Sequence, residues 1–129
     1  MKLLLDTHIW IWSQQEPKRL ARRIREELDS QSNELWLSPI STWELLMLLR
    51  KGKVRLDRDP GLWIAESTSL LFEASLTHEI VVVAERLQLP HADPADRFLA
   101  ATAKVLELTL VTADRKLLGL GDIATLANR

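Results

Sequence analysis

Two short apolar runs, each ending just before an aspartate, restrict the fold of this chain more than any other feature. Lys-Leu-Leu-Leu at residues 2–5 leads directly into Asp6, and Thr-Leu-Val-Thr at residues 109–112 is followed two residues later by Asp114. Short uninterrupted apolar runs are typical of strands that are buried on both faces of a sheet. We therefore predict a buried strand in each segment.

Helical signals alternate with further strand signals between these two runs. In residues 17–29, Leu20, Ile24 and Leu28 recur every four positions behind Pro17, which suits a first helical turn. The other predicted helices span about 39–50 behind a Ser38 cap, 60–71, 78–87 behind a Thr77 cap, and one that begins within 91–103; the other predicted strands are 35–37, 72–75 and 123–126. This alternation predicts an α/β fold with a parallel sheet covered by helices on both faces.

Length and composition limit the class of protein. At 129 residues, with 47% hydrophobic and 27% charged residues, the sequence fits a single globular domain over residues 1–129. It contains no cysteine, which excludes disulfides, zinc–thiolate sites and cysteine nucleophiles. It shows no signal peptide and no apolar run of the roughly 18 residues that a membrane span needs, so we expect a cytoplasmic protein without a membrane partner. The formal net charge of −1 gives no overall attraction to nucleic acid.

Asp6 and Asp114 stand just past the carboxyl ends of two predicted strands. In open parallel α/β sheets, ligands bind outside that end of the strands. Aspartate is also a common helix N-cap, and this explains either residue alone equally well. Together the two residues point to a site without excluding two caps.

Glu44 lies within an apolar stretch of the predicted helix 39–50. Burial of an unpaired carboxylate costs several kcal/mol, so this side chain is either paired or used. The nearest cations in the sequence, Arg50 and Lys51, are about two helical turns away. A salt bridge to a distant arginine is the structural alternative to a role in a site.

Asp93 and Asp96 are three residues apart at the start of a predicted helix, ahead of a small, apolar run at residues 98–103. This spacing places both carboxylates on one side, near the N-terminal end of the helix dipole. One of the two could be only the N-cap. Close packing of the small residues would hold this first turn rigidly.

Four separate segments thus carry acids without an obvious partner, and their repulsion requires a cation if the fold gathers them. Carboxylate oxygens, without cysteine or neighbouring histidines, select hard ions such as Mg²⁺ or Mn²⁺. An ion of this kind commonly orients a water and polarises a phosphoryl group. Phosphodiester hydrolysis is the chemistry that this set of acids favours.

Four segments of the sequence resemble PIN-domain ribonucleases, specifically the VapC-like toxins of bacterial and archaeal toxin–antitoxin pairs. They are LLLDTHIWIW at 3–12, LSPISTWELLML at 37–48 with GKVRL at 52–56, LPHADPADRFLAATA at 89–103, and LVTADRKL at 110–117. The resemblance covers essentially the whole chain, and its third segment is the most specific. Ala113 departs from it, because many relatives have a polar or basic residue at that position.

The resemblance implies a PIN-like αβα sandwich with a short central parallel sheet flanked by helices. The implied catalytic and metal-binding carboxylates are Asp6, Glu44, Asp96 and Asp114, supported by Asp93, Thr7 and Thr112. The implied cofactor is Mg²⁺, for which Mn²⁺ can substitute. The implied activity is that of an endoribonuclease toxin, which cleaves RNA, forms a homodimer, and is inhibited by a cognate antitoxin protein with which it can form larger assemblies.

RNA binding also requires local positive charge, and two basic clusters are candidates. One lies within residues 18–25 and the other follows the predicted helix 39–50. We predict phosphate contacts for the second cluster, at Arg50, Lys51, Lys53 and Arg55. Acidic residues dilute both clusters, so solvated helix faces with paired charges are the alternative.

The tryptophans are interpreted mainly as packing residues rather than as stacking platforms for bases. Of the five, Trp36 and Trp43 are expected in the core or in a dimer interface. Trp10, Trp12 and Trp63 are expected to form a surface patch for the antitoxin or for a second copy.

Histidine and arginine give weaker signals. His8, His78 and His91 are interpreted as structural or surface residues more readily than as a base or ligand. Arg97 directly follows Asp96 and is most simply a surface salt bridge, or else a charge that neutralises the acids or holds a phosphate.

Other functions are compatible with parts of the sequence. A phosphatase of the haloacid dehalogenase type also has a strand ending in Asp-Thr, but it requires a second aspartate where this chain has His8. A phosphorylated receiver domain has no role for Glu44 on an apolar helix. A PIN-like protein that binds RNA or a partner without cleaving it stays open.

Overall fold

A five-stranded parallel sheet forms the centre of the protein, with strand order β3-β2-β1-β4-β5. The computed structural model describes residues 1–89 and 93–129. The strands are β1 (Lys2–Leu5), β2 (Glu34–Leu37), β3 (Phe72–Glu73), β4 (Thr109–Thr112) and β5 (Thr125–Ala127). The helices are α1 (Thr7–Gln15), the 3-10 turn η1 (Pro17–Arg19), α2 (Arg22–Asp29), α3 (Pro39–Arg50), α4 (Pro60–Ser67), α5 (His78–Arg86), α6 (Pro94–Leu106) and α7 (Arg115–Leu118). The predicted α/β fold and the two predicted buried strands are confirmed.

The central strand β1 explains why residues 2–5 are apolar at successive positions. Side chains along a strand alternate between the two faces of the sheet. Leu3 and Leu5 therefore join one hydrophobic cluster and Leu4 the other. Helices cover both faces, so all three leucines are almost completely buried.

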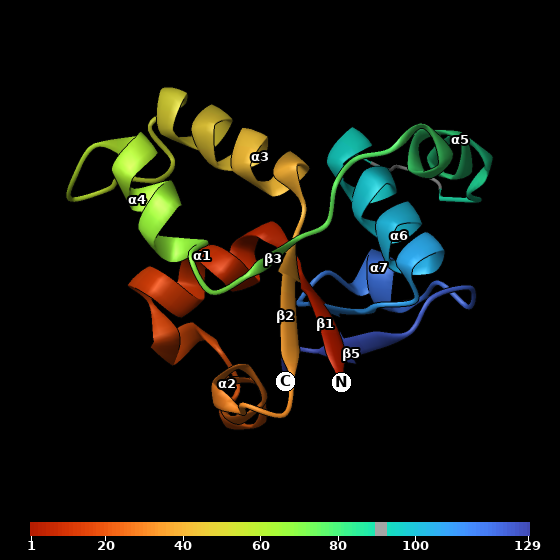
Figure 1. Ribbon diagram of the computed structural model, residues 1–129, viewed down its shortest axis with the longest axis horizontal. Helices are drawn as coiled ribbons and strands as arrows, with labels where there is room; N and C mark the ends of the chain where they lie inside the picture. The colour runs from red at the N-terminus through yellow and green to blue at the C-terminus, as the bar shows by residue number, and fades with distance from the viewer. Residues whose placement is uncertain (90–92) are drawn as a thin grey trace.

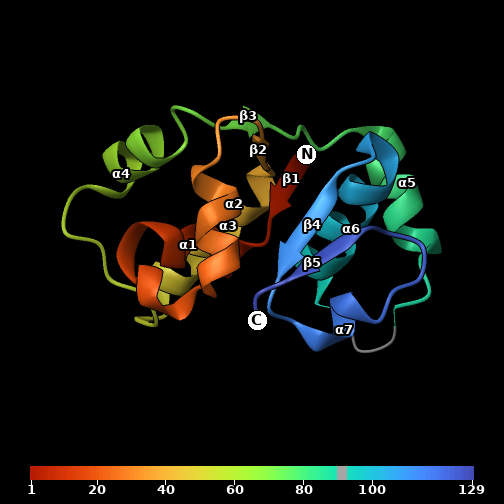
Figure 2. The same cartoon turned by 90° about the horizontal axis from the view of Figure 1, so that it is seen from below.

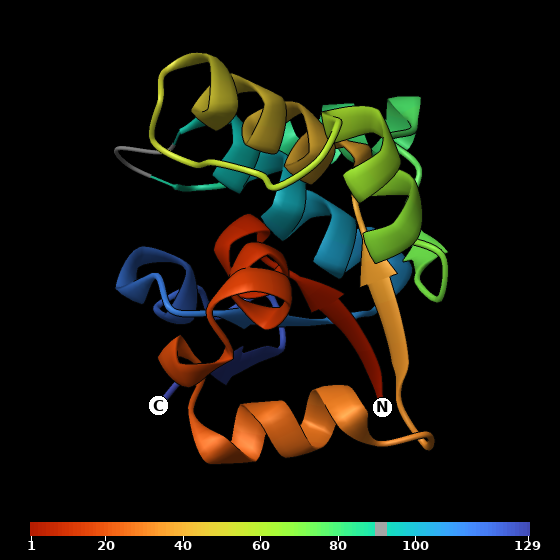
Figure 3. The same cartoon turned by 90° about the vertical axis from the view of Figure 1, so that its left-hand side faces the viewer.

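The helices form two layers, one on each face of the sheet (Figures 1 and 2). Helices α5, α6 and α7 pack into the cluster that contains Leu4, whereas α1, α2, α3 and α4 supply most of the cluster that contains Leu3 and Leu5. Figure 3 shows α3 and α2 at opposite ends of the sheet. This is the predicted sandwich of helices around a parallel sheet. None of the helices within residues 1–89 and 93–129 combines the length and apolar character needed to cross a membrane.

Capping residues set the start of helices α3 and α5 as predicted. The Ser38 hydroxyl accepts the backbone N–H of Ile40 at 3.1 Å, and Pro39 occupies the first turn of α3. The Thr77 hydroxyl accepts the N–H of Ile80 at 3.2 Å at the start of α5. Because a cap satisfies N–H groups that have no partner within the helix, it fixes where the helix begins.

The helix predicted over residues 17–29 is wrong in its first half. Pro17 begins only the 3-10 turn η1, and α2 begins at Arg22. Leu20 between them is extended, with φ −90° and ψ 135°, and its side chain is buried. The four-residue spacing therefore reports two helical pieces that bury the same face, joined by an extended break.

Asn128, near the end of the chain, stabilises this break. Its side-chain oxygen accepts the N–H of Ala21 at 2.7 Å, and its amide nitrogen donates to the carbonyl of Arg19 at 3.0 Å. These two backbone groups would otherwise serve a continuous helix. The contact joins residues more than a hundred positions apart, so no local pattern in residues 17–29 indicates it.

Other element boundaries also differ from the prediction. No helix is predicted over residues 7–15, where α1 lies, because its isoleucines and tryptophans do not follow a clear helical period. Helix α4 ends at Ser67 rather than residue 71, and the hydroxyl of Thr68 donates to the carbonyl of Ile64 at 2.7 Å at that end. Strand β3 stops at Glu73 and β5 starts at Thr125, so both are shorter at one end than predicted.

The predicted surface patch of tryptophans is wrong for two of its three members. Trp10 and Trp63 are buried, and their rings pack at 5.3 Å between centroids where α4 lies against α1. Trp12 is partly exposed. Trp43, expected in the core or an interface, is 50% exposed in this chain. Trp10 and Trp63 are buried rather than exposed because α4 covers the face of α1 that carries Trp10.

Replacing Asn128 by alanine should lower the free energy of unfolding by about 1–2 kcal/mol, because two backbone groups at the break lose their partners. The measurement is urea-induced unfolding, with Arg129→Ala as a control because Arg129 is exposed and keeps its backbone bond to Ala127. Equal stability of the two variants would show that Asn128 does not stabilise the break.

Candidate metal-binding and active site

Asp6 and Asp114 lie at one edge of the sheet because β1 and β4 are adjacent and parallel. Each follows the carboxyl end of its strand, and each caps the helix that comes next. Asp6 Oδ1 accepts the N–H of Thr7 at 2.8 Å, and Asp114 Oδ1 accepts the N–H of Lys116 at 2.9 Å. The cap interpretation is therefore correct for both residues, and it leaves the second oxygen of each for other contacts.

Thr112 connects the two strand ends. Its hydroxyl donates to Asp6 Oδ2 at 2.5 Å and accepts the N–H of Asp114 at 3.0 Å. The side chain of Thr112 is fully buried. Burial raises the pKa of Asp6 above its usual value, while the hydrogen bonds from Thr112 and Thr7 act in the opposite direction.

Glu44 reaches the same region from helix α3. Its Oε1 accepts the hydroxyl proton of Thr7 at 2.5 Å, and Thr7 Oγ1 also lies 2.9 Å from Ser41 Oγ. A hydroxyl has one proton, and the carboxylate is the stronger acceptor. Within the described residues Glu44 forms no ion pair, so the predicted alternative of a salt bridge to a distant arginine is wrong.

Asp93 and Asp96 lie at the start of helix α6. Asp93 is the N-cap, with its Oδ1 accepting the N–H of Ala95 at 3.0 Å. Asp96 lies in the first turn and is partly exposed. The small residues that follow are buried, so they fix this turn in the core as predicted.

One cavity of about 410 Å³ brings these acids together. Helices α1 and α3 contact each other, as do α3 and α6, and Figure 1 shows all three gathered at the end of the sheet. The lining side chains are Asp6, His8, Ile9, Trp12, Glu44, Asp93, Asp96, Ala113 and Asp114. All five predicted carboxylates thus line a single cavity.

The charges in this cavity act on one another. Burial raises the pKa of Asp96 to about 7, and repulsion from Asp6, Asp114, Asp93 and Glu44 contributes in the same direction. Burial likewise raises the pKa of Glu44, with further repulsion from Asp6 and Asp93. The cavity therefore holds more negative charge than its own side chains neutralise.

Comparison with known proteins identifies the family. The PIN domain matches residues 3–122. This chain belongs to the PIN domain family. Ribonuclease VapC22 of Mycobacterium tuberculosis (strain ATCC 25618 / H37Rv) is 30% identical over 118 residues, which cover 89% of this chain and 88% of VapC22.

Solved structures share the PIN fold over almost the whole chain. A chain of VapBC2 from Rickettsia felis, crystallised with a promoter DNA fragment, aligns with a TM-score of 0.76 at 17% identity, covering 98% of both chains. A chain of VapBC-1 from nontypeable Haemophilus influenzae aligns with a TM-score of 0.72 at 19% identity, again over 98% of both chains. The predicted PIN-like sandwich is confirmed.

The acids of this PIN domain offer oxygen ligands suited to a hard divalent cation. In the described part of the chain, no three His, Cys, Asp or Glu side chains yet stand in a geometry that could hold one ion. Asp6 directs both oxygens to hydrogen-bond donors, and Glu44 directs one to Thr7. The donor chemistry and the excess negative charge fit a cation, and a carboxylate oxygen that accepts one hydrogen bond keeps a lone pair that can bind an ion.

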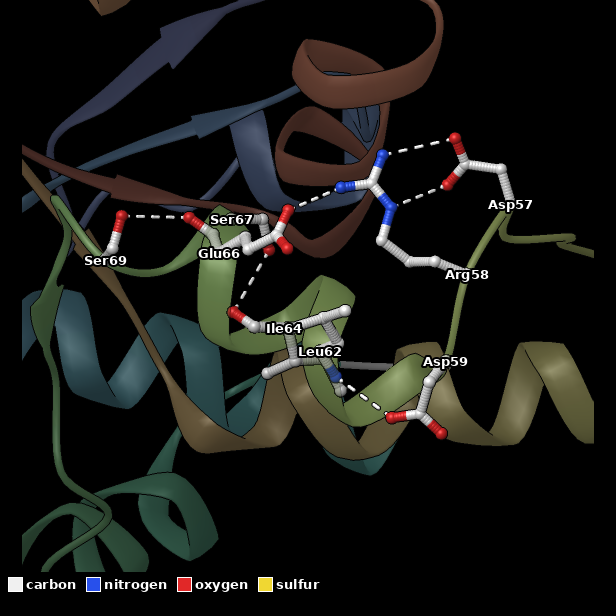
Figure 4. A network of polar contacts seen from close by, with 8 residues as sticks. All are labelled: Asp57, Arg58, Asp59, Leu62, Ile64, Glu66, Ser67 and Ser69. Atoms are coloured by element: carbon white, nitrogen blue, oxygen red, sulfur yellow. Dashed lines mark hydrogen bonds and ion pairs between the residues drawn. The ribbon is translucent and has the colours of Figure 1, made fainter.

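The basic residues predicted to bind RNA lie outside the cavity of this PIN domain. They are Arg50, Lys51, Lys53 and Arg55, all exposed after or at the end of α3. Arg58, further along, is held by Asp57 at 2.9 Å and Glu66 at 2.5 Å (Figure 4). Phosphate contact by residues 50–55 stays a prediction.

Arg97 has a role that the sequence did not indicate. Its Nη1 donates to the carbonyls of Ala84 and Leu87 at 3.1 Å, and its Nη2 donates to that of Leu89 at 3.3 Å. Carbonyls at the end of a helix have no partner within the helix. Arg97 therefore ties the end of α5 to the first turn of α6, and the predicted surface salt bridge is wrong.

His8 and Trp12 line the cavity, although sequence analysis did not place them in a site. They are four residues apart on α1, hence on one face, and their ring centroids are 5.6 Å apart. Burial raises the pKa of both Asp6 and Glu44, and His8 is among the groups that act in the opposite direction. The sequence signal that could have indicated them is their spacing, because His8 follows Asp6 by two residues and Trp12 follows His8 by four.

The other two histidines do not line the cavity as far as the structure describes them. His78 is exposed on α5, and His91 lies outside the described residues.

Asp96→Asn should stabilise the metal-free protein at pH 8 and have little effect at pH 4. The folded-state pKa of about 7 lies above the ordinary 3.8, so the stability that Asp96 contributes is full below about 4 and is lost as pH rises through 7. Asparagine carries no charge at any of these pH values, so the variant does not lose this stability as the pH rises. Thermal unfolding in the presence of a chelator, across this pH range, is the measurement.

Asp122→Asn is the matched control, because Asp122 is exposed and pairs with Lys104 at the surface. If Asp96→Asn and Asp122→Asn give the same pH dependence as the wild type, the carboxylates of the cavity do not repel one another as inferred.

Proposed function

We propose that this PIN domain is an endoribonuclease that hydrolyses phosphodiester bonds in RNA, and that it is the toxin of a toxin–antitoxin pair. The observation that carries the proposal is the cavity at the carboxyl ends of β1 and β4, lined by five carboxylates on a PIN fold. Support for RNA as the substrate comes from its relative VapC22, which is a ribonuclease. Asp6, Glu44, Asp96 and Asp114 are the proposed catalytic residues.

The proposed cofactor is Mg²⁺, with Mn²⁺ able to substitute, held by these four carboxylates with support from Asp93. When bound, the ion orients a water and stabilises the charge that develops on the phosphoryl group. Thr7 and Thr112 hold Glu44 and Asp6 in place through their hydroxyls. Asp96 would hold the ion in its deprotonated form, and because its pKa is raised to about 7, binding near neutral pH would release a proton from it.

The proposed protein partner is a cognate antitoxin. The structural neighbours from Rickettsia felis and Haemophilus influenzae are VapBC complexes, and this chain covers nearly all of the aligned chains. We further propose a homodimer that forms larger assemblies with the antitoxin, in the cytoplasm.

The alternatives have less support. The haloacid dehalogenase-type phosphatase has no support from the family match, and His8 stands where it needs an acid. A PIN domain that binds RNA without cleavage stays an alternative, and a cleavage assay separates it from the nuclease.

Asp6→Asn and Asp96→Asn should each abolish cleavage of single-stranded RNA in millimolar Mg²⁺ or Mn²⁺, because each removes a charged oxygen ligand. The measurement is gel analysis of a labelled RNA, with circular dichroism to show that the variants fold. Asp122→Asn, at the surface, should cleave as the wild type does. Undiminished cleavage by both cavity variants would show that the nuclease site lies elsewhere, and no cleavage by the wild type would favour the RNA-binding alternative.

Mg²⁺ or Mn²⁺ should raise the melting temperature of the wild-type protein, because an ion that binds only the folded state stabilises it. At 100 times its Kd, the ion adds about 2.7 kcal/mol to the free energy of unfolding. Differential scanning fluorimetry should show a smaller shift for Asp96→Asn and the full shift for Asp122→Asn. Equal shifts in all three proteins would place the bound ion outside the cavity.

A further inference from the structure

One wall of the acidic cavity is formed by an aromatic side chain. Trp12 lines the cavity together with Asp6 and Asp96, and its ring is partly exposed. The other four tryptophans have different environments: Trp10 and Trp63 pack on each other in the core, Trp36 stacks on Phe72, and Trp43 is exposed on α3 but does not line the cavity. Trp12 is therefore a partly exposed tryptophan in the wall of the proposed catalytic site.

A cation is stacked on this indole. The guanidinium carbon of Arg19 lies 4.3 Å from the centre of the Trp12 ring. A guanidinium stacked on an aromatic face keeps its N–H donors free in its own plane, where they can hydrogen-bond to a phosphate. Arg19 is only loosely paired with Glu16, at 3.8 Å, and its side chain is 54% exposed.

Because the cavity is negatively charged, an RNA substrate needs a binding contact beside the carboxylates that does not depend on charge. The carboxylates attract a metal ion but repel the phosphates that flank the scissile bond. Stacking of a base on an aromatic ring does not depend on that charge, and it favours single strands because their bases are free to leave the stack. An arginine beside the stacking ring can then bind the next phosphate outside the cavity.

We propose that Trp12 is a stacking platform for an unpaired nucleobase next to the scissile bond, and that Arg19 binds a neighbouring phosphate of the same RNA strand. This inference rests on the proposed ribonuclease function and adds its substrate-positioning residues. The Trp12–Arg19 pair positions the substrate, while the carboxylates remain the catalytic residues.

The test combines a protein variant with an abasic substrate. A short single-stranded oligoribonucleotide that the wild-type protein cleaves at one bond is prepared with an abasic residue at either nucleotide flanking that bond. For the wild-type protein, one abasic position should raise KM on the order of tenfold, which is the size of one base–aromatic stack. Trp12→Leu should raise KM for the intact RNA by a similar factor. In this variant the abasic residue should raise KM no further, because two changes that remove the same contact do not add.

Two further variants separate stacking from packing. Trp12→Phe keeps an aromatic face and should restore most of the affinity and the sensitivity to the abasic residue. Trp43→Leu is the matched control, because Trp43 is exposed on α3 and does not line the cavity, and it should leave KM unchanged. An abasic penalty in Trp12→Leu as large as in the wild type would overturn the stacking role.

Arg19 is tested by salt dependence. Arg19→Gln should reduce the slope of log KM against log salt by about 0.7, the contribution of one phosphate contact in a single strand. Arg86→Gln is the control, because Arg86 is exposed on α5 and does not line the cavity, and it should leave the slope unchanged. An unchanged slope in Arg19→Gln would overturn the phosphate contact.

The outcomes also distinguish this inference from the function on which it rests. Absence of cleavage by the wild-type protein overturns both. Cleavage by the wild type with an unchanged KM in Trp12→Leu overturns the inference alone. If Trp12→Leu cleaves RNA normally but escapes inhibition by the antitoxin, the Trp12 surface belongs to a protein partner and the inference is wrong.

Discussion

The parallel pairing of β1 with β4 brings the carboxylates of Asp6 and Asp114 to the same edge of the sheet, where they repel each other. Burial is the larger cause of the raised pKa of Asp6 and Asp96, and repulsion among the carboxylates adds to it. The pairing cannot be relaxed locally, because Leu4 and Leu110 on these strands are buried in the core. The fold therefore fixes the two charges, and neighbouring groups have to compensate for them.

Backbone N–H groups and two threonine hydroxyls provide this compensation. Helices α1, α6 and α7 each begin at a cavity aspartate, whose side chain accepts a backbone N–H of the first turn. The positive end of a helix dipole favours an anion there. Thr7 and Thr112 then donate to Glu44 and Asp6. Asp6, Asp93 and Asp114 can thus each cap a helix and still be candidate metal ligands, because a carboxylate has two oxygens and the cap uses one of them.

Part of the site could be predicted from the residues alone. Parallel strands end at the same edge of a sheet, so Asp6 and Asp114 were expected to converge, and the small residues after Asp96 indicated a tightly packed helix that would fix it. The place of Glu44, Asp93 and Asp96 beside them was expected from the resemblance to PIN-domain ribonucleases. Features that depend on distant contacts could not be predicted. The break between η1 and α2 needs Asn128, the burial of Trp10 needs α4, and Arg97 binds carbonyls of the α5 end that no local pattern reveals.

The raised pKa of Asp96 links stability to binding. Close to neutral pH, the cavity lowers its repulsion by keeping a proton on Asp96, and under the proposed function a divalent cation would do the same by replacing that proton. Neither arrangement gives the five carboxylates of the cavity a net positive charge. Under the proposed ribonuclease function, affinity for RNA would therefore come from groups beside the acids, so Trp12 and Arg19, rather than the carboxylates, are where differences in substrate choice among such sites would arise.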